Sequence, residues 1–213
     1  MWRRCAVRYL VPELPGAWGA AGALLHQGPD DWILRCVVMS TTRSADQFKL
    51  GAHVQLLAVP TRYLVGPLHQ PLRRLGPRVF WDTPATVTEA GPGMAEIAEA
   101  IRAQAVPYLD TYGTTEALQR HFDELVDDRP FDIHFQEAAF CLRLINGDVD
   151  GALAAAAGAV SAAAQETRDW AQELAGRVSA VADQLRTDHA AALRMLRTHA
   201  GTTRQHLRLP PPA

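Results

Sequence analysis

The sequence predicts an α+β fold: a small antiparallel sheet of about four strands packs with helices, and an all-helical C-terminal half ends in a long helix. Two observations support this. Apolar and polar residues alternate over 47–57, which is the period of a strand with one buried face. From Gly91 onward, apolar residues recur at helical spacing. We therefore expect a sheet region over 1–110 and a helical region over 111–213. Whether the two form one compact domain stays open.

The sheet region contains one clear strand and several weaker ones. A short apolar run over 22–26 precedes a Gly-Pro-Asp turn, and residues 31–39 form a second run that is apolar on both faces. The link from this run to the strand at 47–57 is short and polar, which predicts an antiparallel hairpin. Residues 60–77 are broken by Pro and Gly and leave room for one edge strand, and 78–82 is expected as the last strand. The apolar face of the clear strand carries Phe48, Leu50, Ala52, Val54 and Leu56.

Helices are expected from the apolar periodicity and from residues that start or stop a helix. Pro107 should disturb the last turn of the helix that starts near Gly91, and Thr114 or Thr115 caps the next one. The sequence Asn146-Gly147-Asp148 predicts a turn between two helices. The expected helices cover residues 2–11, about 91–109, 115–128, 132–145, 149–164 and about 166–198.

Composition and charge exclude several classes of protein. With 48% hydrophobic residues, the chain has enough apolar surface to build a core and is not a disordered protein. The net charge of −2 argues against a nucleic-acid binder, whose phosphate contacts need a basic excess. Apolar runs are too short to span a bilayer, and Pro12, Glu13 and Pro15 interrupt any signal-peptide core. We expect a soluble cytoplasmic protein that does not contact a membrane.

Three segments together resemble a known family. They are the strand pair DWILRCVVMSTTRSADQFKLGAHVQLL, the segment AVPYLDTYGTTEALQRHF and the hairpin CLRLINGDVDGALAAA. In this order they are similar to the bacterial proteins grouped as domain of unknown function 4304, over about residues 1–160. The chain departs from that family where Gly16-Ala17-Trp18-Gly19 replaces a basic stretch before the first strand. The family has no established reaction, so the resemblance implies an α+β fold and assigns no site.

Motifs for catalysis, metal binding and cofactor binding are weak or absent. The eight His residues form no HExxH pair, and His199 and His206 lack a third ligand, so we expect no metal. Neither a GxSxG elbow nor a dinucleotide or Walker fingerprint occurs, and no cofactor is expected. Cys36 and His53 lie on adjacent expected strands, but Cys36 is assigned to the apolar face and His53 to the polar face. On that assignment they cannot meet.

The most distinctive charged feature is a run of carboxylates near the end of the helix at 115–128. Residues 111–150 carry 3 basic and 9 acidic groups, which gives a local charge of −6. The simplest interpretation is a solvated helix end. The sharper hypothesis is an acidic face that binds a basic protein partner, as in an immunity-type protein or an adaptor without catalysis. The long last helix offers a possible homodimer contact. The acidic residues are Asp123, Glu124, Asp127, Asp128 and Asp132.

Two other functions stay open. The alternative is a small-ligand-binding protein or an enzyme, with a site on the polar sheet face lined by Arg35, His53 and Gln55. A nucleic-acid binder ranks last. It would use arginines near both ends of the chain, namely Arg3, Arg4, Arg194, Arg197, Arg204 and Arg208.

Overall fold

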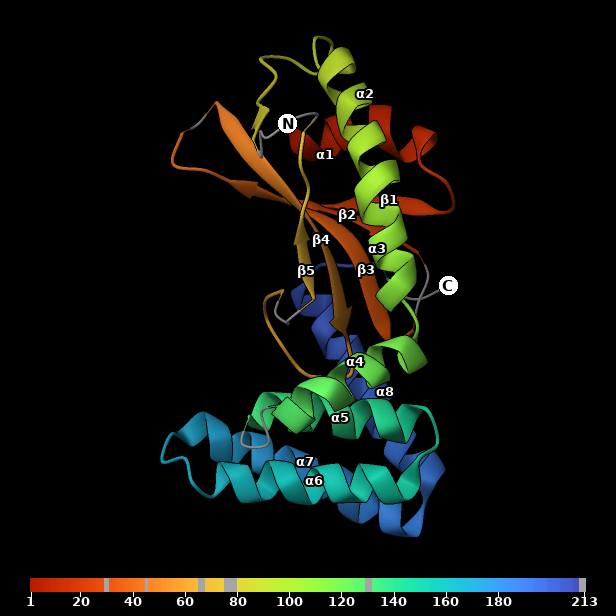
Figure 1. Ribbon diagram of the computed structural model, residues 1–213, viewed down its shortest axis with the longest axis vertical. Coiled ribbons are helices and arrows are strands. Elements are labelled where there is room, and N and C mark those ends of the chain that lie inside the picture. The colour runs from red at the N-terminus through yellow and green to blue at the C-terminus, as the bar shows by residue number, and fades with distance from the viewer. Residues whose placement is uncertain (29–30, 45, 65–67, 75–79, 129–131, 211–213) are drawn as a thin grey trace. The chain divides into compact units, whose positions relative to one another are not determined.

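The computed structural model of the chain describes residues 1–28, 31–44, 46–64, 68–74, 80–128 and 132–210 (Figure 1). It confirms the α+β class, with an antiparallel sheet and helices first and a helical half after them. The chain forms two compact units. The sheet unit comprises Met1–Gln55, Tyr63–Gly113 and Leu207–Ala213, and the helical unit comprises Leu56–Arg62 and Thr114–His206.

The sheet has six strands instead of about four. They follow the order β1-β2-β3-β4-β5, and β6 pairs with the start of β4. β1 was not expected, because the sequence WGAA has no apolar alternation. It forms a hairpin with β2 around Gly22, whose φ of 58° suits a residue without a side chain. The bounds are β1 Trp18–Ala21, β2 Leu24–Gln27, β3 Ile33–Thr41, β4 Gln47–Leu56, β5 His69–Pro71 and β6 Trp81–Asp82.

Helices cover the apolar face of this sheet. α1 (Trp2–Cys5) continues as a π-helical turn at Ala6–Leu10. α2 (Gly91–Ala100) continues as a π-helical turn at Ile101–Ala105 and then into α3 (Val106–Tyr112). Gln70 of β5 stands opposite Ala52 and donates a hydrogen bond of 3.4 Å to the carbonyl of Gln104, in the π-helical turn at Ile101–Ala105. The predicted apolar face of β4 is confirmed, since all five of its residues are buried.

Pro107 disturbs the helix, as expected, but does not end it. It sits in the first turn of α3, where a backbone N–H has no partner within the helix in any case. The helix widens to a π-helical turn at Ile101–Ala105, directly before the turn that contains Pro107, and then continues to Tyr112.

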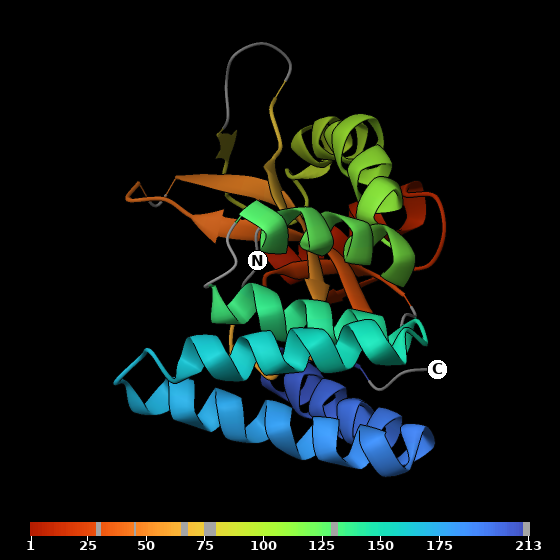
Figure 2. The same cartoon turned by 60° about the horizontal axis from the view of Figure 1, so that its bottom comes forward.

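The helical unit is a stack of helices that pack against their neighbours in sequence (Figure 2). Short side chains allow close packing at its centre, where the Ala-rich face of α6 meets α5. Asp132 and Asp148 cap α5 and α6 through their carboxylates. The bounds are α4 Thr115–Asp128, α5 Ile133–Ile145, α6 Val149–Ala163, α7 Asp169–Thr187 and α8 His189–His206.

The last expected helix, over about 166–198, is in fact two helices. Asp188 lies between α7 and α8 in an extended conformation (φ −151°, ψ 100°), and its carboxylate accepts a 3.0 Å bond from the N–H of Ala191. This bond caps α8, so a new helix starts after Asp188 although the apolar pattern continues across it. The apolar stripe is buried within the chain at Leu174, Val178, Val181, Leu185 and Leu196. A homodimer through this segment remains a prediction.

A buried ion pair links α5 to α7. Glu137 has only 2% of its side chain exposed, and Arg177 donates to its Oε1 from Nε (2.9 Å) and Nη2 (2.7 Å). Burial raises the pKa of Glu137 despite the attraction of Arg177. Because removal of charge from water is costly, a lone carboxylate here would destabilise the unit.

Among the described residues, no helix is long and apolar enough to cross a membrane.

We expect Arg177→Met to lower the free energy of unfolding by about 3 kcal/mol, because it leaves Glu137 buried without its partner. The matched control is Arg186→Met. Arg186 pairs with Asp183 at the surface of the same helix, where such pairs contribute less than about 1 kcal/mol. Urea unfolding at pH 7, followed by circular dichroism, measures both losses. Equal losses in the two variants would contradict this account.

Candidate functional site

The sheet unit contains a half-open apolar pocket of about 180 Å³. Its wall is built from the start of the chain, the β3–β4 hairpin, the segment after β6 and the start of α2. Three of the four methionines of the protein line it. The lining residues are Met1, Trp2, Cys5, Met39, Thr41, Thr42, Ser44, Gln47, Phe48, Thr83, Pro84 and Met94.

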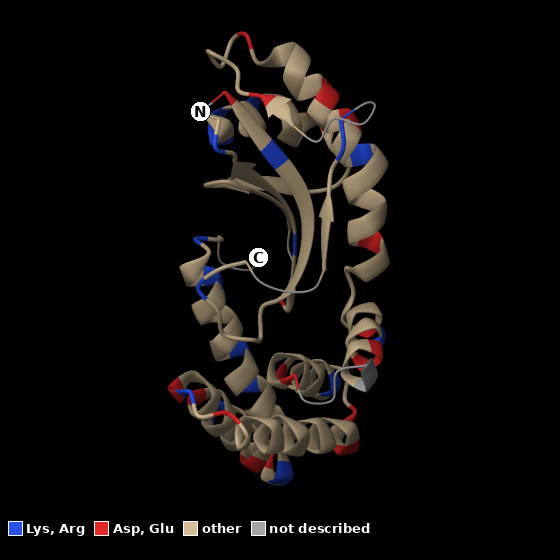
Figure 3. Ribbon diagram, turned by 60° about the vertical axis from the view of Figure 1, so that its left-hand side comes forward, with Lys and Arg blue, Asp and Glu red and all other residues tan. Residues whose placement is uncertain are grey.

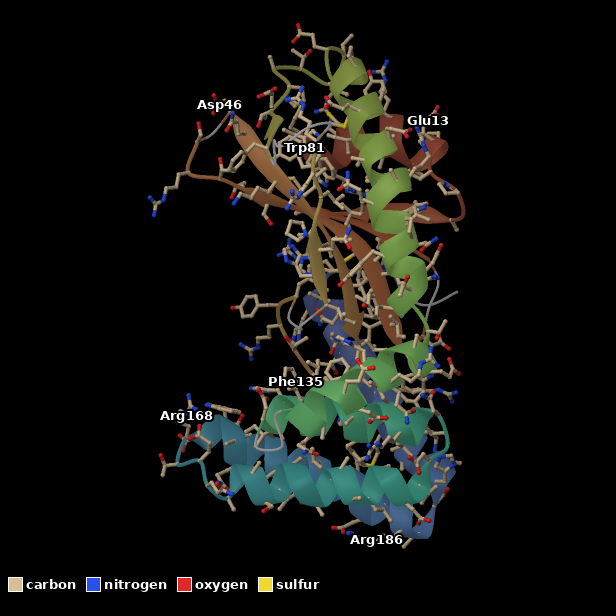
Figure 4. All side chains as sticks on the ribbon, viewed as in Figure 1. Glu13, Asp46, Trp81, Phe135, Arg168 and Arg186 are labelled. Carbon is tan, nitrogen blue, oxygen red and sulfur yellow. The ribbon has the colours of Figure 1, made fainter. Side chains whose placement is uncertain are left out.

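An aromatic cluster fixes the floor of this pocket. Phe48 of β4 meets Trp2 edge-on at 5.7 Å between ring centroids and stacks on Trp81 at 6.4 Å. Phe48 and Trp81 stand opposite each other in the β4–β6 pair; Trp81 is marked in Figure 4. These rings are rigid and mutually packed, whereas the three methionines of the lining are flexible.

The lining carries no Asp, Glu, Lys, Arg or His side chain. Its polar side consists of Thr, Ser and Gln residues of the hairpin and Thr83. The Thr42 hydroxyl already contacts the carbonyls of Ser44 (2.8 Å) and Gln47 (3.1 Å). In contrast, the Nε1–H of Trp2 is buried and has no acceptor among the described residues.

The predicted ligand face does not assemble as one group, because Arg35 lies on the other side of the sheet from His53. Gln70 and its partner Ala52 face the helices, so His53, the next residue on β4, faces away from them. Arg35 faces the helices, since a Cβ placed on Gly113 at the end of α3 would overlap its side chain. Gln55 shares the face of His53 and is buried. Of the three residues predicted to line a ligand site, His53 and Gln55 share one face of the sheet, and Arg35 lies on the other.

A second histidine joins His53. His69 of β5 stands directly opposite it, and the two rings lie 4.3 Å apart between centroids. The ring of His69 also lies over Gly51, where a side chain would collide with it. Burial, with a contribution from the charge of His69, lowers the pKa of His53 to about 4, and burial also lowers that of His69. Both rings are therefore neutral at pH 7.

The expected separation of Cys36 and His53 is wrong. Cys36 follows Arg35 on β3, so it faces away from the helices, as His53 does. Its cross-strand partner His26 is on the same face. Burial raises the pKa of the Cys36 thiol to about 12, and burial also raises that of Cys141. Since the thiolate is the nucleophile, neither residue is activated for attack at neutral pH.

Among the residues that the structure describes, no group of three or more His, Cys, Asp or Glu side chains is placed to hold a metal ion. His199 is half-buried on α8, and the ring of His206 contacts the carbonyl of Thr61 at 3.2 Å.

The acidic residues have mixed surroundings. Asp123 accepts two bonds from Arg143, at 2.9 and 3.2 Å, and Asp132 caps α5. Glu124 is exposed and lies 3.9 Å from His121. Asp127 and Asp128 end α4, but their side chains lie outside the described part. Charged residues are sparse on the strands and frequent on the helices (Figure 3). Binding of a basic partner by the acidic face remains a prediction.

The pocket was missed by the sequence interpretation. Its residues come from four separated segments, and none of them belongs to a recognisable motif. The available signal was the run Met1-Trp2 at the start of the first helix, which places two large apolar side chains where a solvated helix end would be polar.

We expect stability to fall as the pH drops from about 7 to 4. The unfolded chain binds a proton at His53 near its ordinary pKa of 6.5, whereas the folded protein does so only near 4. The free energy of unfolding should fall by about 1–2 kcal/mol, after allowance for solvent screening at this half-buried ring.

His53→Phe keeps a ring against His69 and should flatten this slope in urea unfolding measured at several pH values. His69 and His199, whose pKa values are also lowered, leave a residual slope. The explanation fails if His53→Phe keeps the slope of the unaltered protein.

No family model matches the chain, and neither a curated protein nor a solved structure matches it. The similarity to domain of unknown function 4304 thus rests on the sequence motifs alone.

Proposed function

We propose that this protein is a small-molecule-binding protein whose ligand occupies the apolar pocket of the sheet unit. The observation that carries this proposal is the convergence of three methionines, Trp2 and Phe48 on one half-open hollow without a charged side chain. Small-molecule sites are typically concave and mostly apolar, with a few polar groups that orient the ligand. The hairpin hydroxyls and Gln47 are the polar groups here.

The size of the pocket limits the ligand. A dry apolar cavity of about 150 Å³ accepts a benzene molecule. The present pocket, at about 180 Å³, therefore suits one ring with a short substituent. Methionine side chains are unbranched and adaptable, so they can move to fit such a ligand.

The lining favours binding over catalysis. General acid–base catalysis needs a titratable group within hydrogen-bond reach of the ligand. The titratable groups that the wall residues carry are the thiol of Cys5, which is fully buried, and the α-amino group of Met1. The Ser44 hydroxyl donates a hydrogen bond to the carboxylate of Asp46, but the lining contains no His that could act as a general base for the Ser and Thr hydroxyls.

Methionine methyl NMR with toluene tests the proposal on the full chain. Toluene should shift the methyl signals of Met1, Met39 and Met94, and leave that of Met195 unchanged, because Met195 lies on α8 in the helical unit. With seven heavy atoms, a dissociation constant of about 0.1–1 mM lies well inside the limit for small ligands. Four unshifted signals at millimolar toluene would overturn the proposal.

Two neighbouring substitutions locate the site. Thr41 is exposed on β3 and lines the pocket, whereas Ser40 is exposed and lies on the opposite face of the same strand. Thr41→Trp should block the pocket and weaken toluene binding at least about tenfold, which corresponds to about 1.4 kcal/mol. Ser40→Trp should leave the affinity unchanged. Equal affinities in both variants would place toluene elsewhere.

A further inference from the structure

Two histidines of the sheet form a pair outside the pocket. His53 of β4 and His69 of β5 are direct cross-strand partners on strands that lie side by side (Figure 1), and their ring centroids are 4.3 Å apart. Neither residue lines the pocket. Because the backbones of the two strands are paired at these positions, the sheet itself holds the two imidazole rings next to each other.

The nitrogens of this pair can be reached from solvent. In the described part of the chain, neither ring has a hydrogen-bond or ion-pair partner. His69 is exposed. His53 is half-buried, but none of its nitrogens is among the buried polar atoms that lack a partner, so its unpaired ring nitrogens keep accessible surface. A small ion can therefore approach both rings.

We propose that His53 and His69 bind one divalent transition metal ion that prefers right-angled bonds, such as copper(II), through one nitrogen of each ring, with water in the other coordination positions. Imidazole is the commonest metal ligand in proteins and binds in its neutral form. Both rings are neutral at pH 7, because burial lowers their pKa values. The site lies outside the pocket, so the proposal does not depend on the proposed function.

The distance between the rings favours copper(II) over zinc. Metal–imidazole bonds are about 2.0–2.1 Å long, so two rings on one ion have centroids about 4.5 Å apart when the bonds meet at a right angle, and about 5.2 Å apart at the tetrahedral angle of zinc. The observed 4.3 Å lies near the first value. Copper(II) prefers square-planar or tetragonal geometry, and it heads the affinity order of the divalent first-row metals.

Gly51 provides the space in which His69 lies. A side chain at position 51 would collide with Nε2 of His69, so the glycine allows both rings to occupy this face. Exposed side chains change rotamer within nanoseconds. His69 can therefore turn a nitrogen toward an ion that His53 already holds.

Two ligands bind more tightly than one because they act together. Once one ring holds the ion, binding by the second ring is intramolecular, and such a pair can exceed a single ligand about 10²–10⁴-fold in affinity. His26 provides a matched comparison. Its ring also lies over a glycine of the neighbouring strand, Gly19, but its partner on β3 is Cys36, which burial keeps as a thiol.

The experiment uses copper(II) as the probe on the full chain. Isothermal titration calorimetry at pH 7 compares the unaltered protein with His69→Gln and His26→Gln. His69→Gln should weaken copper(II) binding at least about tenfold, because it leaves a single ring at the site. His26→Gln should leave the affinity unchanged. Since His69 is exposed, its substitution leaves no cavity, and circular dichroism checks that each variant is folded.

Electron paramagnetic resonance with one equivalent of copper(II) counts the nitrogen ligands. The spectrum should show splitting by two nitrogens in the unaltered protein and by one in His69→Gln. The proposal is overturned if His69→Gln keeps the affinity or the two-nitrogen spectrum, or if His26→Gln weakens binding as much as His69→Gln does. Either result would leave the proposed function standing, because toluene binding is measured at other residues.

Discussion

The sheet unit depends on the packing of Phe48 between two indole rings. Trp2 comes from the start of the chain, Phe48 from the beginning of β4 and Trp81 from β6, so the cluster joins segments up to 79 positions apart. Aromatic side chains bury large areas and prefer edge-on or offset stacking, and both arrangements occur here. The rings fix where α1 and β6 meet the sheet. They also leave beside them a space that flexible methionines line and do not fill.

Much of the fold was predictable from local sequence patterns. The alternation in β4 and the cap at Thr114, whose hydroxyl accepts a bond from the N–H of Ala117, are local features that the sequence predicted and the structure shows. β1 could not be predicted, because four residues without alternation become a strand only by pairing with β2. The break at Asp188 had a visible signal, a residue that favours helix starts, but the apolar stripe across it suggested one continuous helix.

The candidate site was much less predictable than the fold. Because β3 is apolar on both faces, its own sequence cannot show whether Cys36 or Arg35 shares the face of His53. Contacts of Gln70 with Gln104, and of Arg35 beside Gly113, settle that point. Both contacts join residues more than 30 positions apart. The pocket is a still more distributed feature, since it exists only after the hairpin, α1 and α2 have come together.

Polar groups of the sheet unit differ in whether they have a hydrogen-bond partner. The Trp18 indole donates to the carbonyl of Pro15 at 2.9 Å, and Gln104 bonds the backbone of Arg73 in both directions. In contrast, the buried indole N–H groups of Trp2 and Trp81 have no acceptor among the described residues. Among described side chains with an unpaired buried donor, Trp2 is the one that also lines the pocket. A phenylalanine at position 2 would offer an aromatic edge to Phe48 without the unpaired N–H. The cost of the unpaired indole N–H of Trp2 therefore opposes the edge-on packing of the same ring on Phe48, and the cluster keeps the indole in place in spite of that cost.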